Sequence, residues 1–350
     1  MQKIIHSQDY RSIHPIINEL EQFYALTSEK TLQSQTALFK PTFDNAFGYL
    51  QSLFNQYGDT VCDFDLVQKN YPTLDIPKKR NTVIVCFSGG KDSTATAVYY
   101  KNLGYDVYLY HVKAINKSYP DEWKRAQDVA DYLELPIYFD TYELKGQLGF
   151  IEHPMKNMII ANGALQWAVH NNLGYNIAVG NYLTGGLNSS MFYICGDDSP
   201  QLWDAYELIL RKAIPDFRVS IVLKNHGDTL DILSSDIKLF ELCQSCIGAQ
   251  RFRKWNHDNN EKKYGIKLLK HRCGSCWKCC VEYIYLADHD KVEYNEPYYI
   301  HCLDVLKKSD LRENGVIFST VENLWDGYFQ YDISKSKYKN ILKYGRRGNK

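Results

Sequence analysis

The sequence has no long apolar run and no excess of charge of either sign, and each absence excludes a class of protein. No window holds the roughly 20 apolar residues that a membrane-spanning helix needs. The N-terminus, MQKIIHSQDYRSIHP, lacks the apolar stretch and cleavage site of a signal peptide. Lys and Arg total 41, and so do Asp and Glu, which excludes a globally basic nucleic-acid binder but leaves a local basic patch open. We therefore expect a cytoplasmic protein with no membrane partner, for which a nucleic-acid partner is not indicated outside a local basic patch.

The cysteines are unevenly distributed. Ten cysteines in a small secreted protein would indicate disulfides, but this chain has 350 residues and no visible secretion signal. Six of the ten lie between Cys243 and Cys280, which indicates a metal site. We expect the other four to be buried thiols: Cys62, Cys86, Cys195 and Cys302.

Strand and helix patterns alternate through the middle of the chain. Strands are predicted over Thr82–Phe87, Asp106–Val112, Pro136–Asp140, Asn176–Gly180 and Phe217–Leu223. Helices are predicted over Ser93–Leu103, Pro120–Leu133, His153–Asn171 and Gln201–Lys212. This order predicts an α/β fold with a parallel, five-stranded, doubly wound sheet, whose ligands bind at the carboxyl ends of the strands.

We place this α/β domain at residues 82–235. Three further segments precede and follow it. Residues 1–80 form a helical N-terminal extension, with helical patterns over Ile13–Leu26 and Phe43–Tyr57. Residues 236–290 form a cysteine-rich subdomain. Residues 291–350 form a C-terminal extension, helical between Glu293 and Phe329 and ending in a basic tail.

The loop between the first predicted strand and the helix that follows has an unusual composition. It consists of Ser88, Gly89, Gly90, Lys91, Asp92 and Ser93. The glycines let the backbone approach an anion closely and adopt positive φ, and the helix N-terminus adds unpaired N–H groups and partial positive charge. The serines add hydroxyl donors, and the lysine adds a full charge. The aspartate either caps the helix or helps to hold Mg²⁺.

The spacing of this loop differs from the Walker P-loop and from GxGxxG. It resembles the PP-loop of the N-type ATP pyrophosphatase superfamily, whose members split ATP between the α and β phosphates; the alternative is a plain glycine turn with a helix cap. The resemblance implies that adenosine lies beside His111 and Val112 at the end of the second strand. It also implies that Gly180, at the end of the fourth, borders the α-phosphate and the activated substrate. For His111 a packed structural histidine is the equal alternative.

The cysteine cluster has the spacing of a metal site. Cys273, Cys276 and Cys279 are separated by two residues each, which lets neighbouring thiolates face one ion. A fourth thiolate from the CQSC segment, Cys246 or Cys243, would complete a tetrahedral zinc site. Cys280, which lies outside this run, is then expected to point away. An iron–sulfur cluster and sulfur-handling reactive cysteines are the alternatives.

Together, the loop and the cysteines resemble 7-cyano-7-deazaguanine synthases of the queuosine pathway. The similarity covers about residues 82–285, and includes the Trp203–Lys212 helix and the segment around Lys224–Leu233. It implies Zn²⁺ bound by Cys246, Cys273, Cys276 and Cys279. The spacing departs from the family, because 26 residues separate Cys246 from Cys273. The family's short base-holding motif is also not legible between Asn181 and Ser190.

The resemblance implies a reaction. A carboxylate, expected to be 7-carboxy-7-deazaguanine or a related deazapurine acid, attacks the α-phosphorus of ATP. Pyrophosphate leaves with Mg²⁺, assisted by Lys91, Asp92 and Ser93. Ammonia or another amine then displaces AMP, which gives an amide or nitrile. A zinc ion with four thiolates has no open position, so its role is structural.

Four readings of the function stay open at the level of sequence. The first is the deazapurine ligase. The second is a diverged ligase of an antiviral system that joins the acid to a protein amine. The third is a PP-loop tRNA thiolase, and the fourth is a non-catalytic nucleotide-binding scaffold. The sequence leaves the oligomeric state open, including a homodimer.

Overall fold

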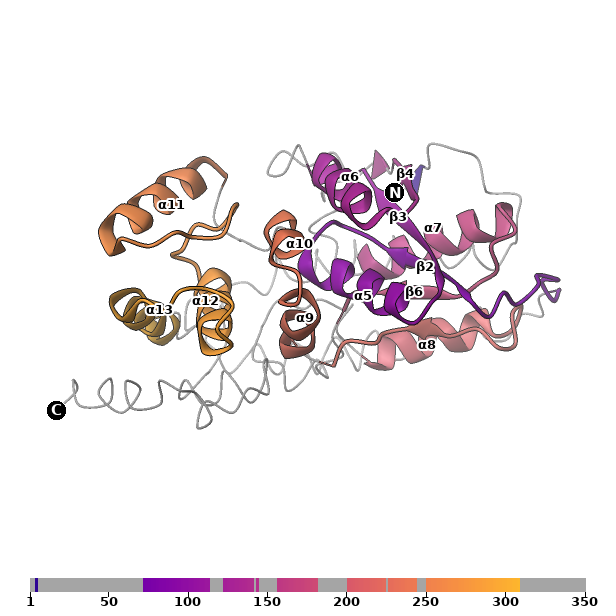
Figure 1. Cartoon of the computed structure of the whole chain (residues 1–350). Helices are drawn as coiled ribbons and strands as arrows, with labels where there is room; N and C mark the ends of the chain where they lie inside the picture. Colours follow the sequence, from indigo (N-terminus) through magenta and orange to yellow (C-terminus); the bar gives the residue numbers. More distant parts are fainter. Residues whose placement is uncertain are drawn as a thin grey trace, which may run out of the picture. The chain divides into compact units, whose positions relative to one another are not determined.

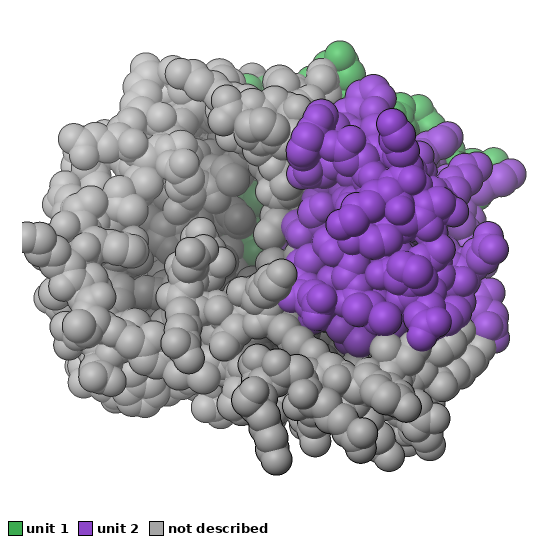
Figure 2. Space-filling model, turned by 90° about the vertical axis from the view of Figure 1, so that its left-hand side faces the viewer, with its two compact units in different colours: residues 1–188, 192–224 green, residues 189–191, 225–350 purple. Residues whose placement is uncertain are grey.

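The computed structural model of the chain describes residues 4–5, 72–113, 122–141, 143–144, 156–181, 200–224, 226–243 and 250–308 (Figure 1). The predicted helices Ile13–Leu26 and Phe43–Tyr57, the basic tail and Cys246 lie outside these ranges. The chain divides into two compact units (Figure 2). Unit 1 comprises residues 1–188 and 192–224, and unit 2 comprises residues 189–191 and 225–350.

Unit 1 is built on a parallel sheet of five strands. These are β2 (Thr82–Cys86), β3 (Asp106–Val112), β4 (Ile137–Asp140), β6 (Ile177–Val179) and β7 (Val219–Ser220). Their order across the sheet is β4-β3-β2-β6-β7, and every neighbouring pair is parallel. The predicted five-stranded parallel α/β fold is therefore confirmed. A separate antiparallel pair joins β1 (Ile4–Ile5) to β5 (Glu143–Leu144).

Helices cover both faces of the sheet. The four are α5 (Lys91–Asn102), α6 (Glu122–Leu133), α7 (Lys156–His170) and α8 (Pro200–Leu210). Ile84 and Tyr110 pack with residues of α7 and α8 in one buried cluster. Side chains alternate along a strand, so Val83 and Val85 face the opposite side, where α5 and α6 contact the central strands. The doubly wound arrangement follows from this alternation of buried residues in β2 and β3.

The strand order creates a switch point next to β2. The chain runs from β2 to β3 and β4 on one side, and then returns to β6 on the other. In an open parallel sheet, ligands bind at such a point, outside the carboxyl ends of the two strands where the order reverses. Here those ends are followed by the Ser88–Ser93 loop after β2 and by Gly180 after β6.

Unit 2 is helical in the part that the structure describes. Its helices are α9 (His226–Leu233), α10 (Ile237–Leu242), α11 (Gln250–Tyr264), α12 (Trp277–Asp288) and α13 (Glu296–Lys308). The Tyr283 ring of α12 contacts the Tyr298 ring of α13 edge-on at 4.5 Å. The first residues of the predicted C-terminal extension therefore share a core with the cysteine-rich segment. Residues 226–235, predicted to belong to the sheet domain, lie in this unit. None of the described helices has the length and apolarity needed to cross a bilayer.

Candidate active site and metal centre

Two serines tie the loop after β2 into a compact turn. The Ser88 and Ser93 hydroxyl oxygens lie 3.1 Å apart, and Ser93 Oγ accepts from the Ser88 amide at 3.2 Å. Ser88 Oγ accepts from the Gly90 amide at 3.2 Å, and the Ser93 hydroxyl donates to the Gly90 carbonyl at 3.2 Å. The serines therefore hold the loop from within, which positions the backbone around Gly89 and Gly90 before any ligand binds.

Glycines allow the loop to pack closely against its neighbours. Gly89 has φ +71°, and a Cβ built there would lie 2.8 Å from the Ala126 Cα of α6. A Cβ on Gly180 would lie 2.5 Å from the Ser93 N and 2.6 Å from the Asp92 carbonyl carbon. The space beside Gly180 is thus filled by the first turn of α5. The structure therefore shows Gly180 in close contact with helix α5. The predicted contact of Gly180 with a ligand stays a prediction.

The first turn of α5 carries the charged residues of the loop. Gly90, which has no side chain, is the N-cap residue, so Asp92 does not occupy the N-cap position that one of its two predicted roles required. Asp92 lies in the first turn, where a negative charge is favoured by the helix dipole. The Lys91 side chain is only 3% exposed. Its participation in binding phosphate, like that of Asp92 in binding Mg²⁺, stays a prediction.

His111 is held by the end of β2. Its Nδ1 lies 2.8 Å from the Phe87 carbonyl oxygen, and the residue is 3% exposed. Burial, the largest cause, and the charges of Lys113 and Arg125 together lower the pKa of His111 to about 4, although the hydrogen bond to the Phe87 carbonyl acts to raise it. The imidazole is therefore neutral at pH 7, with Nδ1 donating and Nε2 an acceptor. The structure thus shows His111 as a packed, hydrogen-bonded histidine, which is one of its two predicted roles. The contact of His111 with adenosine stays a prediction.

Sequence reasoning missed a basic and aromatic group at the same edge of the sheet. The Lys113 Nζ lies 4.6 Å from the ring centres of both Trp123 and Phe139. The Phe139 ring contacts His111 edge-on at 5.3 Å. Val112, the last residue of β3, is buried beneath this edge. The sequence shows the aromatic residues Trp123 and Phe139, but nothing in it indicates that they lie beside Lys113. Only the pairing of β3 with β4 shows that Phe139 and Lys113 are neighbours.

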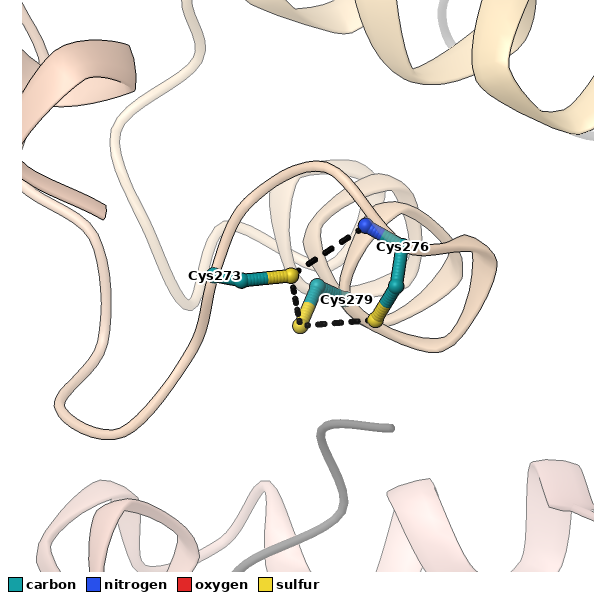
Figure 3. A group of neighbouring side chains, drawn as sticks. All are labelled: Cys273, Cys276 and Cys279. Carbon is teal, nitrogen blue, oxygen red and sulfur yellow. Dashed lines mark hydrogen bonds between the residues drawn. The ribbon is translucent and has the colours of Figure 1, made fainter. Parts of the chain in front are cut away.

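Three of the predicted metal ligands meet in unit 2. Cys273, Cys276 and Cys279 have sulfur atoms within 4.8 Å of one another (Figure 3). The Cys279 Sγ lies 3.4 Å from the Cys276 Sγ and 3.9 Å from the Cys273 Sγ. Tetrahedral zinc with Zn–S bonds of about 2.3 Å separates its sulfurs by about 3.8 Å. The three thiols therefore fit one ion of this geometry.

The backbone of the cysteine loop supports this arrangement. The amides of Ser275 and Cys276 donate to the Cys273 Sγ at 3.4 and 3.3 Å, which favours a thiolate there. Gly274 has φ +70°, and a Cβ on it would meet Leu268 and the Tyr298 hydroxyl oxygen within 2.8 Å. Only a glycine therefore fits between these cysteines without strain.

Side chains from two other helices brace the loop. Asn260 of α11 donates to the Cys273 carbonyl at 3.0 Å and to the Ser275 hydroxyl at 2.7 Å. The Tyr298 hydroxyl of α13 donates to the Gly274 carbonyl at 3.0 Å. Sequence reasoning missed both residues, because nothing in their local pattern distinguishes them from ordinary helix residues.

A buried arginine joins this loop to α10. The Arg272 Nε donates to Glu282 at 2.6 Å, Nη1 to the Cys243 carbonyl at 2.7 Å, and Nη2 to the Phe240 carbonyl at 3.1 Å. Burial acts to lower the pKa of Arg272, but the Glu282 carboxylate together with Cys279 and Cys243 more than offsets this, and the pKa is raised. The guanidinium thus fixes the start of the CQSC segment to the residue that precedes Cys273.

The other cysteines of the cluster are placed differently. Cys243 is buried and does not belong to the group of three. Cys280 does not belong to the group of three either; its Sγ lies 4.0 Å from the Gly274 carbonyl oxygen, and burial and Cys302 raise its pKa well above the usual value. That Cys280 points away from a bound ion stays a prediction. Cys246, the preferred fourth ligand, lies outside the described residues.

Comparisons of the sequence with known proteins find one local similarity. No family model matches the chain. A stretch of 62 residues is 36% identical to 7-cyano-7-deazaguanine synthase 2 of Sulfurisphaera tokodaii. That stretch covers 18% of this chain and only 14% of the synthase, so the activity of the whole synthase comes to this protein only as a proposal.

Solved structures give distant matches. The U34-tRNA thiolase of Methanococcus maripaludis is 19% identical, with a TM-score of 0.32 over 60% of this chain and 75% of its own. NMN synthetase of Francisella tularensis is 10% identical, with a TM-score of 0.30 over 80% and 99%. A predicted tRNA methyltransferase subunit of Methanocaldococcus jannaschii is 20% identical, with a TM-score of 0.26 over 61% and 93%. Similarity at this level does not identify the activity of this protein.

Proposed function

We propose that unit 1 is an ATP pyrophosphatase that adenylates a carboxylic acid. The observation that carries the proposal is the position of the SGGKDS loop. It follows a buried parallel strand, opens a helix, and lies at the switch point of the sheet. Its backbone is set by the Ser88–Ser93 hydrogen bonds and by the close contact of Gly180 with α5. A preformed anion site of this kind suits the two phosphates that leave as pyrophosphate.

Each residue of the site has a proposed task. The amides of the loop and Lys91 bind the β and γ phosphates and stabilise the charge that develops as they leave. Asp92 would hold Mg²⁺, which would neutralise charge on the leaving phosphates. His111 and Val112 border the adenosine, with the neutral Nε2 of His111 accepting a hydrogen bond. Gly180 borders the α-phosphorus, where the carboxylate attacks.

The proposed acid is 7-carboxy-7-deazaguanine or a related deazapurine acid. The support is the 36% identity of the 62-residue stretch to a 7-cyano-7-deazaguanine synthase, together with the CGSCWKC run. An amine then displaces AMP from the acyl adenylate. Ammonia gives an amide or, after a second activation, a nitrile. A protein amine would give the conjugate expected of a diverged ligase.

We also propose that Cys246, Cys273, Cys276 and Cys279 bind a structural zinc ion. The sulfur separations of 3.4 and 3.9 Å support one ion, because an iron–sulfur cluster binds each thiolate to a different iron and holds the sulfurs further apart. Arg272 fixes the Cys243 carbonyl, and Cys246 follows only three residues later, a reach of at most about 11 Å. Metal analysis tests this: zinc supports the ligase, whereas iron with labile sulfide would favour a tRNA thiolase.

The decisive experiment measures product and pyrophosphate together. The purified protein is incubated with ATP, Mg²⁺, 7-carboxy-7-deazaguanine and ammonium, and the product is identified by mass spectrometry. We expect AMP, pyrophosphate and an amide or nitrile. Lys91→Ala should abolish pyrophosphate release, whereas Lys79→Ala, which removes an exposed lysine of the same unit, should not. Release of ADP and phosphate instead would contradict cleavage between the α and β phosphates.

A further inference from the structure

Unit 2 carries a basic hairpin that neither the ATP site nor the metal site uses. The hairpin consists of α11 and the segment 265–272, which returns beside it (Figure 1). Glu261 accepts from the Leu268 amide at 2.8 Å, and His257 Nδ1 lies 2.7 Å from the Arg272 carbonyl. These two contacts align the helix with the return segment.

The hairpin concentrates charge in a chain whose total is zero. Residues 250–272 contain eight Lys and Arg residues and two acidic residues, a net charge of +6. Both acidic residues are engaged within the hairpin. Asp258 pairs with Lys254 at 2.6 Å, and Glu261 pairs with His257 at 3.3 Å. The acidic residues of the hairpin therefore do not balance its basic residues, of which Arg272 pairs with Glu282 of α12.

Four lysines of the hairpin are exposed and have no carboxylate partner among the described residues. They are Lys262, Lys263, Lys267 and Lys270. Solvated lysines of this kind usually serve only solubility. A second feature distinguishes this surface, because Trp255 of the same helix is 64% exposed. Lys262 lies two helical turns after Trp255 and thus on the same face.

We propose that this basic hairpin binds a nucleic acid with an unpaired base. The lysines neutralise phosphates, and the exposed indole of Trp255 stacks on a base. An acidic polypeptide would satisfy the lysines but would leave the indole without a planar partner, so the tryptophan favours the nucleic acid. The hairpin accounts for most of the 26 residues between Cys246 and Cys273, and none of its residues has a task in the proposed ATP chemistry of unit 1.

Fluorescence anisotropy tests the proposal with the full chain and its metal. The probe is a labelled single-stranded RNA of roughly 20 nucleotides, longer than the ~4–16 nucleotides of small single-strand-binding modules. Four phosphate contacts predict that log K falls with log[salt] with a slope of about −2.8. Replacing all four lysines by Gln should weaken binding and flatten this slope. Lys79→Gln, an exposed lysine of unit 1, should change neither.

Trp255→Ala separates stacking from charge. We expect it to weaken binding by about 5- to 150-fold while the salt slope stays unchanged, and Trp255→Phe to keep most of the affinity. If the fourfold variant loses its metal, Lys263→Gln takes its place, with a slope change of about 0.7. The proposal is overturned if the RNA fails to bind at low salt, or if Trp255→Ala binds like the wild type. Equal displacement of the RNA by polyglutamate would also overturn it. Pyrophosphate release with the small acid should be unaffected in every variant.

Discussion

Gly180→Ala tests whether the close contact between β6 and α5 sets the geometry of the proposed ATP site. A Cβ at this position would lie 2.5 Å from the Ser93 nitrogen, 2.6 Å from the Ser93 Cα and 2.6 Å from the Asp92 carbonyl carbon. All three atoms belong to the backbone of the first turn of α5, so no side-chain rotation relieves the clash. The helix must move away from the strand by an appreciable fraction of an ångström.

The expected cost has two parts. Overpacking of a buried site typically destabilises a protein by about 1–3 kcal/mol, and a clash with backbone belongs at the upper end of this range. Displacing the N-terminus of α5 also moves the Lys91–Ser93 segment. Because an error of ~1 Å in a catalytic group can cost about 100-fold in rate, we expect pyrophosphate release to fall by at least roughly 10-fold.

Urea unfolding and pyrophosphate release are measured on the same preparations. The control is Gly104→Ala, because Gly104 ends α5 with φ +78° and no atom lies within 4 Å of the added Cβ. That variant should lose about 1 kcal/mol through backbone strain and keep its turnover. If Gly180→Ala unfolds at the same urea concentration as the wild type and releases pyrophosphate at the same rate, the packing role of Gly180 is refuted.

Three further predictions concern the metal, the buried arginine and His111. Cys276→Ser and Cys246→Ser should each lose the bound zinc and much of the stability of unit 2, whereas Cys280→Ala should retain the zinc; equal zinc content in all three would contradict the assignment. Arg272→Ala should cost about 3–5 kcal/mol in unfolding free energy, because it removes the guanidinium that pairs with the buried Glu282 carboxylate, and an Arg272→Met, Glu282→Leu pair should recover most of it. His111 binds fewer protons folded than unfolded between its usual pKa of 6.5 and its lowered pKa of about 4, so stability should fall as pH drops through this window. At pH 5 the loss relative to pH 8 is about 2 kcal/mol, and a His111→Gln variant that shows the same loss would contradict this origin.

The fold was predictable because the strands of unit 1 are short, apolar and regularly separated by helices. β3 was predicted as Asp106–Val112, the bounds that the structure has, and β2 differs by one residue. β7 is shorter than its prediction, because only Val219 and Ser220 pair with β6. Pairing depends on a partner strand, which the local apolar pattern of residues 217–223 does not encode.

The candidate sites were predictable only in their local parts. The SGGKDS loop and the CGSCWKC run each lie within a few consecutive residues, so spacing alone identified them. The residues that hold them are distant in sequence: Ala126 beneath Gly89, Asn260 beside Cys273, and Tyr298 beside Gly274. A single sequence contains no signal that pairs such positions.

The missed residues show how the insertion between the cysteine pairs is accommodated. The 26 residues after Cys246 would leave the two halves of a metal site far apart if they were unstructured, and closing such a loop costs entropy. Instead, α11 and the return segment are aligned by Glu261 and His257, and Asn260 connects α11 directly to the Cys273 carbonyl. The insertion is thus part of the support for the proposed metal site, and its surface carries the exposed Trp255 and the exposed lysines of the hairpin. A change in that surface should leave the metal in place, whereas a change at Asn260 should release it.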